Sequence, residues 1–296
     1  MQTHVGVRRI CGNNRIVVIV LNAATLSEAQ ISSGSSSGNR APGATPPRAF
    51  RKPERIDKML NRPQVIIFDV NETLFSLDAI GDRFAEAGLP AENVQLWFAR
   101  VLREAFALGC LDARRPFREI GRVELEGLLS AHGVADIEST AKHIFDGFEH
   151  LDPYPEVPAT FEMLRAAGVR IATLTNGHAE VTERLLKRSG LDGYVERCLS
   201  VDNAARWKPF PEPYRFALDV CGVAGSEAAM VAVHSWDLAG AKRAGLTTGY
   251  ASRLEGGFIP FYPEPDVAGA DLVAVAEGLL AFGRDPARAD ARAEMS

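Results

Sequence analysis

The sequence predicts an α/β fold, in which a doubly wound parallel sheet is interrupted by an inserted helical cap. Three observations lead to this class. The apolar run at 65–68 shows no alternation, as expected for a strand that is covered on both faces. From residue 151 onward, strand-like and helical segments alternate, which indicates helical crossovers between parallel strands. The segment between these two regions is wholly helical in pattern.

An extension of 62 residues precedes this domain. Residues 31–47 are rich in Gly, Ser and Pro, a composition typical of linkers. The apolar stretch at 16–21 follows several arginines and faintly resembles a secretory signal, but it is short and no convincing cleavage site follows it. We therefore expect residues 1–62 to be disordered or linker-like, with Met59 as an alternative translation start.

The first strand of the domain runs from Val65 to Phe68 and ends on Asp69. The predicted cap at 80–151 is inserted into the core, which takes residues 63–79 and 152–283. A tail follows at 284–296. The clearest helix of the cap carries an amphipathic stripe made of Val94, Trp97, Phe98, Val101, Leu102, Ala105 and Leu108. Further helices are expected around 121–133 and 139–151.

The second half of the domain predicts the rest of the sheet. Strands are expected within 169–175, 195–201, 228–234 and 247–252, and helices within 178–190, 211–222 and 236–245. Such a sheet has helices on both faces. A cap inserted after the first strand lies near the carboxyl edge of the sheet, where its closure would exclude water from a site.

Composition narrows the classes of function. A hydrophobic content of 46% with 24% charged residues is typical of a globular protein, and the net charge of −5 argues against a nucleic-acid partner. The apolar run at 16–21 is too short to span a bilayer, so we expect no membrane partner. Four widely spaced cysteines without CxxC pairing predict free thiols and a cytoplasmic protein.

Polar residues follow three of the predicted strands. These are Asp69 after the first, 175–177 after the second and 234–237 after the strand at 228–234, while Lys208 lies in a loop beyond the strand at 195–201. Because parallel strands end at one edge of a sheet, these groups can converge there. For Asp69 alone, capping of the following turn is an alternative explanation.

The order and spacing of these residues resemble the four motifs of the haloacid dehalogenase superfamily, which here are Asp69 with Thr73, Thr175-Asn176-Gly177, Lys208-Pro209 and Trp236-Asp237. The resemblance covers about residues 63–283 and extends to the type II L-2-haloacid dehalogenases, with a Rossmann-like core. Arg100 falls 31 positions after Asp69, where these enzymes carry an essential arginine. Tyr214 falls six positions after Lys208, where they carry a tyrosine.

This resemblance implies that Asp69 attacks the halogen-bearing carbon of a short (S)-2-haloacid and displaces halide, leaving an ester that water hydrolyses. Lys208 would keep Asp69 ionised, and Asp237 would orient or activate the water. The main chain after Gly177 would help to bind the substrate carboxylate. The side chains implied for substrate binding are Asn71, Thr73, Thr175, Asn176, Tyr214 and Trp236, of which Asn176 and Trp236 would hold the leaving halide together with Arg100.

Position 71 separates the sequence from the phosphatases of the superfamily. They place an aspartate there because an alkoxide leaving group needs a proton, whereas halide does not, and Asn71 cannot titrate. With Lys208 and Arg100 offsetting Asp69 and Asp237, we expect no metal and no other cofactor.

The sequence also departs from the dehalogenases, which have Tyr-Gly at 71–72, serine at Ala232 and asparagine at His234. His234 could serve the hydrolytic water, because its ordinary pKa lies near neutrality, or it could simply be satisfied by backbone hydrogen bonds. A regular turn would point Glu72 away from Asp69, and a distorted turn would present it as an acid.

Three functions remain open: a metal-independent dehalogenase with a small 2-haloacid as its partner, a Mg²⁺-dependent phosphatase with Glu72 or His234 as the acid, and a non-catalytic protein that binds a small carboxylate or another partner. Arg100 could also be a surface residue, and Tyr214 could serve packing alone. Candidates for a homodimer surface on the cap are Trp97, Phe98 and Phe106, for which core packing is the alternative.

Overall fold

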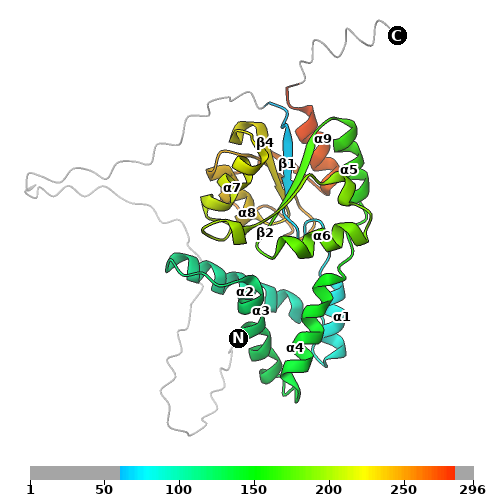
Figure 1. Ribbon diagram of the computed structural model, residues 1–296, viewed down its shortest axis with the longest axis vertical. Helices are drawn as coiled ribbons and strands as arrows, with labels where there is room; N and C mark the ends of the chain where they lie inside the picture. The colour runs from blue at the N-terminus through cyan, green and yellow to red at the C-terminus, as the bar shows by residue number, and fades with distance from the viewer. Residues whose placement is uncertain (1–60, 284–296) are drawn as a thin grey trace, which may run out of the picture. The chain divides into compact units, whose positions relative to one another are not determined.

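The computed structural model describes residues 61–283, so the expectations for residues 1–60 and 284–296 lie outside the described residues. Six parallel strands form one sheet in the order β3-β2-β1-β4-β5-β6 (Figure 1). Their bounds are Val65–Phe68 for β1, Arg170–Thr175 for β2, Arg197–Ser200 for β3, Ala228–Ala232 for β4, Thr247–Ala251 for β5 and Val267–Gly269 for β6. The predicted doubly wound parallel sheet is confirmed.

Burial on both faces explains the unbroken apolar run of β1. Ile66 and Phe68 belong to one apolar cluster, and Val65 and Ile67 belong to another, so successive side chains enter opposite layers. Helices α5, α6 and α9 contribute to the first cluster, and α7 and α8 to the second (Figure 1). The bounds are Val157–Ala166 for α5, Ala179–Arg188 for α6, Pro211–Cys221 for α7, Ser235–Arg243 for α8 and Leu272–Ala281 for α9.

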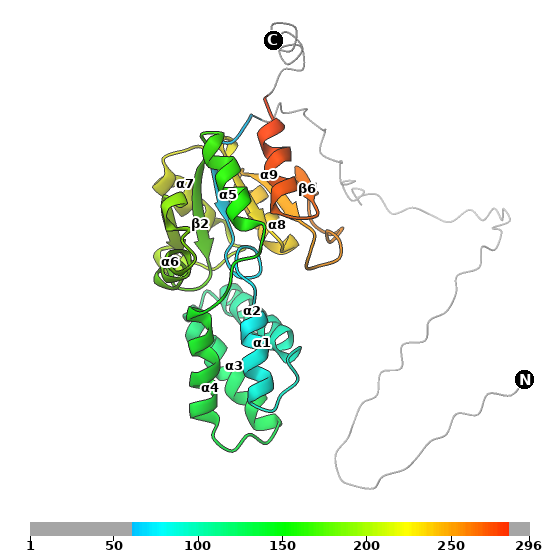
Figure 2. The same ribbon diagram turned by 90° about the vertical axis from the view of Figure 1, so that its right-hand side faces the viewer.

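The helical insertion follows β1 and its turn. Four α-helices make it up: α1 (Asp78–Glu86), α2 (Asn93–Cys110), α3 (Phe117–Ala131) and α4 (Ile137–Asp146). Figure 2 shows them grouped together, beyond the end of the sheet. The insertion predicted from the amphipathic pattern is therefore present as a helical cap.

A cluster of aromatic rings holds the cap together. The fully buried ring of Trp97 lies edge-on to Phe117 and Phe145, at centroid distances of 6.3 and 5.8 Å, and its Nε1 donates to the carbonyl of Gly121 at 2.9 Å. Phe98 is buried beside it. Packing within the cap therefore accounts for two of the three residues considered for a homodimer surface.

Side chains of the cap also contact the core. Phe106, the third of those residues, lies edge-on to Trp236 with centroids 5.2 Å apart. Phe117 stacks on Trp207, with centroids 6.2 Å apart and planes 24° apart. Two of the three tryptophans in the sequence thus lie at contacts between the cap and the core.

Three elements of the core had not been expected: α5, β6 and α9. The strand β6 is only three residues long, and α9 is apolar around most of its circumference, which leaves little amphipathic signal. Within residues 61–283, no helix is long and apolar enough to cross a membrane.

Candidate active site

Asp69 lies where β1 ends, between the ends of β2 and β4, and only 7% of it is exposed. The hydroxyl of Thr73 donates to Asp69 Oδ2 at 2.7 Å and accepts from the main-chain N–H of Val233 at 3.2 Å. Thr73 thereby ties the turn after β1 to the end of β4. It is fully buried, so it supports the carboxylate rather than lining a pocket.

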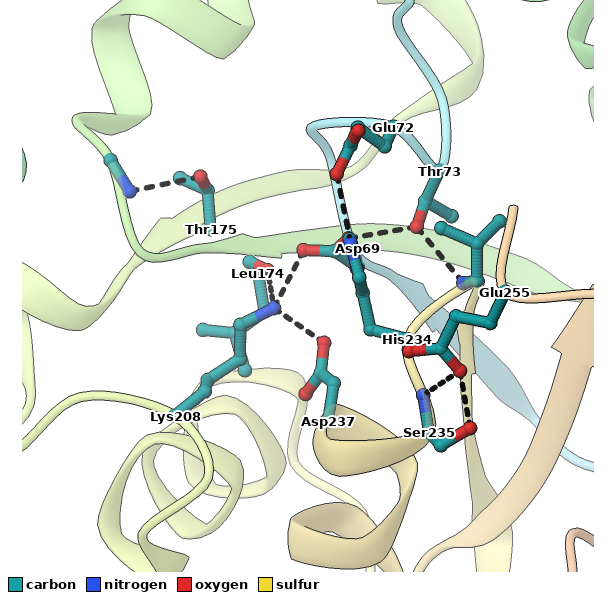
Figure 3. Close-up of polar contacts among 12 residues, drawn as sticks. Asp69, Glu72, Thr73, Leu174, Thr175, Lys208, His234, Ser235, Asp237 and Glu255 are labelled. Carbon is teal, nitrogen blue, oxygen red and sulfur yellow. Dashed lines mark hydrogen bonds and ion pairs between the residues drawn. The ribbon is translucent and has the colours of Figure 1, made fainter. Parts of the chain in front are cut away.

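Lys208 joins this carboxylate to a second one. Its ammonium group donates to Asp69 Oδ1 at 2.7 Å, to Asp237 Oδ2 at 2.7 Å and to the carbonyl of Leu174 at 2.9 Å (Figure 3). All three protons of the ammonium are therefore used, as a fully buried lysine requires. The predicted convergence of Asp69, Lys208 and Asp237 is what the structure shows.

Burial and charge separate the proton affinities of the two aspartates. Burial raises the pKa of Asp69, but Lys208 and His234 together outweigh it and hold this pKa well below its usual value. Burial also raises the pKa of Asp237, and here Lys208 does not outweigh it. Burial lowers the pKa of Lys208, yet the two carboxylates leave it raised. Asp69 thus has the lower proton affinity of the two aspartates and Asp237 the higher.

Tyr214 stands behind Asp237. Its hydroxyl lies 2.6 Å from Asp237 Oδ1, and it is fully buried. Burial, the charge of Asp237 and this hydrogen bond raise the pKa of Tyr214 well above its usual value, so the hydroxyl keeps its proton and donates it. Tyr214 therefore orients Asp237 and does not face a substrate in this structure.

His234 lies between two carboxylates. Its Nε2 is 3.0 Å from Glu72 Oε2, and its Nδ1 is 3.5 Å from Asp69 Oδ2. Burial lowers the pKa of His234, but the neighbouring carboxylates of Asp69 and Glu72 raise it to about 10. The turn is distorted, since Glu72 has a φ of 63°, and this brings the carboxylate to the histidine.

A cap residue completes this arrangement. Gln95 of α2 donates from Nε2 to Glu72 Oε1 at 2.7 Å, so both oxygens of a glutamate that is only 3% exposed have partners. Sequence reasoning missed Gln95, because its contact depends on how α2 docks over the turn after β1.

The residues after β2 offer free polar groups. Gly177 donates its N–H to Thr175 Oγ1 at 3.0 Å, so this amide is engaged locally, while no contact among the described residues uses the hydroxyl proton of Thr175. Asn176 accepts from the main chain of Lys208 at 3.1 Å through Oδ1, which leaves its NH₂ group without a partner among residues 61–283. Both side chains can therefore donate to an anion.

The structure does not bring Arg100 to this group. Arg100 makes no hydrogen bond or ion pair with any residue of the described range. Phe98, two positions earlier on α2, has its ring centroid 6.4 Å from that of His234. Two positions along an α-helix turn a side chain by about 200°, so Arg100 points away from the face of α2 that meets the site. Trp236, in contrast, lies 5.4 Å from the ring of His234.

A pocket opens beside the turn after β1 and the end of β2. Asn71 and Thr175 line its polar side, and the rings of Phe117 and Phe145 line its apolar side. A cation also borders it: Arg118 of α3, whose guanidinium lies 5.5 Å from the ring of Phe145. No pattern in the sequence pointed to Arg118, because its place at the pocket depends on the orientation of the cap.

Comparison with known proteins gives a consistent result. The family model described as haloacid dehalogenase-like hydrolase matches residues 63–245. The (S)-2-haloacid dehalogenase 4A of Burkholderia cepacia is 31% identical over 192 residues, which cover 64% of this chain and 83% of the relative. A solved dehalogenase with an intermediate complex has a TM-score of 0.66 at 28% identity and covers 72% of this chain and 95% of its own.

The L-2-haloacid dehalogenase of Xanthobacter autotrophicus, solved with chloropropionic acid covalently bound, has a TM-score of 0.67. The two sequences are 22% identical, and the match covers 75% of this chain and 100% of the other. This similarity shows that the two proteins share a fold.

Proposed function

The chain belongs to the haloacid dehalogenase-like hydrolases, and we propose that within this family it hydrolyses short (S)-2-haloacids to (R)-2-hydroxy acids through an ester on Asp69, without a metal or other cofactor. The observation that carries the proposal is the state of Asp69. Its carboxylate is buried, receives hydrogen bonds from Lys208 and Thr73, and has a strongly lowered pKa. A carboxylate stripped of water and held ionised is a competent nucleophile.

The residue at position 71 supports halide as the leaving group. Asn71 borders the pocket and has no proton that it could transfer, and halide departs without one. The NH₂ group of Asn176 and the ring edge of Trp236 are the groups that we assign to the departing halide. Attack of Asp69 at C2 from the side opposite the halide inverts the configuration there.

The pocket suits a small acid with a short apolar substituent. Its polar side offers the hydroxyl of Thr175 to a carboxylate, and its other side is aromatic. The buried cluster holds three carboxylates, which are Asp69, Glu72 and Asp237. Only two cations, Lys208 and His234, face them within the cluster, so an anionic substrate needs a further positive charge. We assign that role to Arg118, which borders the pocket together with Glu149 and His178.

A Mg²⁺-dependent phosphatase of the same superfamily is the second candidate. The observation in its favour is His234, a buried imidazolium beside the nucleophile that could protonate an alkoxide. The donor set fits a metal poorly, because Asn71 is no carboxylate and each of the four carboxylate oxygens of Asp69 and Asp237 already accepts a hydrogen bond.

The test measures halide release from (S)-2-chloropropionate in the presence of EDTA, for the wild type and for Asp69→Asn. We expect release by the wild type, none by the variant, and little from the (R)-enantiomer, because attack needs the halogen in line with Asp69. Cleavage of p-nitrophenyl phosphate that depends on Mg²⁺, without halide release, would establish the phosphatase instead.

A further inference from the structure

Glu72 belongs to a chain of four polar side chains that begins at the exposed Gln95 of the cap and ends at the buried Asp69. Glu72 pairs with His234, whose Nδ1 lies 3.5 Å from Asp69 Oδ2 (Figure 3). Gln95 donates to Glu72 from the cap. The two ring nitrogens of His234 thus have different surroundings. Nε2 is engaged with Glu72, while Nδ1 is buried and makes no hydrogen bond within residues 61–283.

This arrangement has a cost for the fold. Glu72 occupies the left-handed region of backbone conformation, which favours glycine, and a glutamate that is 3% exposed needs partners for both of its oxygens. Backbone strain together with a buried charge pair persists when the surroundings enforce it, and such features cluster at functional sites. The orphaned nitrogen of His234 points to the function, because it is aimed at the nucleophile.

We propose that Glu72 is a positioning residue that acts through His234, and that His234 Nδ1 transfers the protons during hydrolysis of the Asp69 ester. The inference rests on the proposed function, since it concerns the second step of that reaction. It assigns Glu72 and Gln95 to the working site, and it leaves the first step, attack of Asp69 at C2, independent of Glu72.

The proton transfers balance as follows. A water oxygen bonds to Cγ of Asp69 as one water proton passes to Nδ1 of neutral His234. The bond between Cγ and the ester oxygen then breaks, and the departing alkoxide of the 2-hydroxy acid takes the proton back from His234. The carboxylic acid that remains on Asp69 passes its proton to Nδ1 of His234, which restores the starting carboxylate and imidazolium.

Charge explains when His234 is neutral. The charged groups that face it are Asp69 and Glu72, with Lys208 beyond Asp69, and the rings of Phe98 and Trp236 are uncharged. In the free enzyme both carboxylates favour the imidazolium. Ester formation removes the charge of Asp69, while burial continues to disfavour the imidazolium, so the pKa of His234 falls in the intermediate. The imidazolium then loses its proton to solvent, which is the one proton that the overall reaction releases, and the neutral base is available once the ester exists.

The test separates the two steps. Full-length Glu72→Gln, His234→Gln and the double variant are mixed with (S)-2-chloropropionate, and intact-protein mass spectrometry follows the ester on Asp69 while halide release is recorded. We expect one burst of halide in each variant and an ester that hydrolyses about 10²-fold more slowly than in the wild type. The double variant should be no slower than His234→Gln, because Glu72 acts through His234.

The matched control is Glu255→Gln. Glu255 is also partly buried and accepts from the main chain of Ser235 at 3.0 Å, next to His234, but it lies outside the proposed chain. In the Glu255→Gln variant, the ester on Asp69 should hydrolyse at the wild-type rate. A second measurement follows the His234 ring by NMR: the wild type should stay protonated at pH 8, and Glu72→Gln should titrate at lower pH.

The outcomes against the inference are distinct. Unchanged ester hydrolysis in Glu72→Gln, or an effect that adds fully to that of His234→Gln, would overturn the role of Glu72. A wild type that forms neither ester nor halide would overturn the proposed function itself, and this inference with it, whatever the titration of His234.

Discussion

Asp69 and its neighbours show how single residues set the protonation states of the site. Lys208 keeps Asp69 ionised, Tyr214 orients Asp237, and Glu72 holds His234. The sequence predicted Asp69, Lys208 and Asp237 correctly as neighbours, because the ends of parallel strands must meet. It could not predict the contact between Glu72 and His234, which depends on a left-handed residue in the turn.

Two arginines of the cap, Arg118 and Arg100, provide a test at the residue scale. We expect Arg118→Ala to raise KM for (S)-2-chloropropionate about fivefold with a smaller change in kcat, because an exposed cation at the pocket contributes up to about 1 kcal/mol to binding of the anion. Arg100→Ala is the matched variant, and its KM should stay within a factor of two. Steady-state kinetics of both variants measure this difference.

The reverse result would mean that the cap docks differently during turnover. A large loss for Arg100→Ala, with Arg118→Ala unaffected, would place Arg100 in the site and would contradict the assignment of Arg118.

At the scale of elements, α8 supports the site through close packing. A Cβ atom on Gly240 would lie 2.6 Å from the hydroxyl of Tyr214 and 2.6 Å from the carbonyl of Pro209, so α8 approaches both only because this residue is glycine. The strand ends and most helices of the core were predictable from periodicity. A close approach of this kind was not, since it depends on the distance between two elements.

We therefore expect Gly240→Ala to displace Tyr214 from Asp237 and to lower kcat about tenfold, with a loss of roughly 1–3 kcal/mol in the free energy of unfolding from overpacking. Gly127→Ala is the control, because a Cβ there meets no atom within 4 Å and alanine favours the helix. Halide release and urea denaturation of both variants provide the measurement. Equal activity of the two would contradict the role given to Tyr214.

The free energy of unfolding of the whole molecule should depend on pH through the protonation of His234. Its pKa is raised from 6.5 to about 10 in the folded state, so its contribution is complete below pH 6.5 and is lost as the pH rises through 10. We expect the free energy of unfolding of the wild type to fall by a few kcal/mol between pH 7 and 10.

Urea denaturation at pH 7, 8.5 and 10 measures this loss. The variant with Glu72→Gln and His234→Gln should show a smaller decrease over the same interval, since other alkaline groups are common to both proteins. Parallel pH dependences would contradict a protonated His234 in the folded enzyme.

The aromatic contacts between the cap and the core have an optical consequence. Trp207 stacks on Phe117 and Trp236 meets Phe106 across that boundary, while Trp97 lies inside the cap. Opening of the cap would expose the first two indoles to water and leave the third in place. Intrinsic fluorescence therefore reports cap movement without any label, and stopped-flow emission can time its closure against the release of halide.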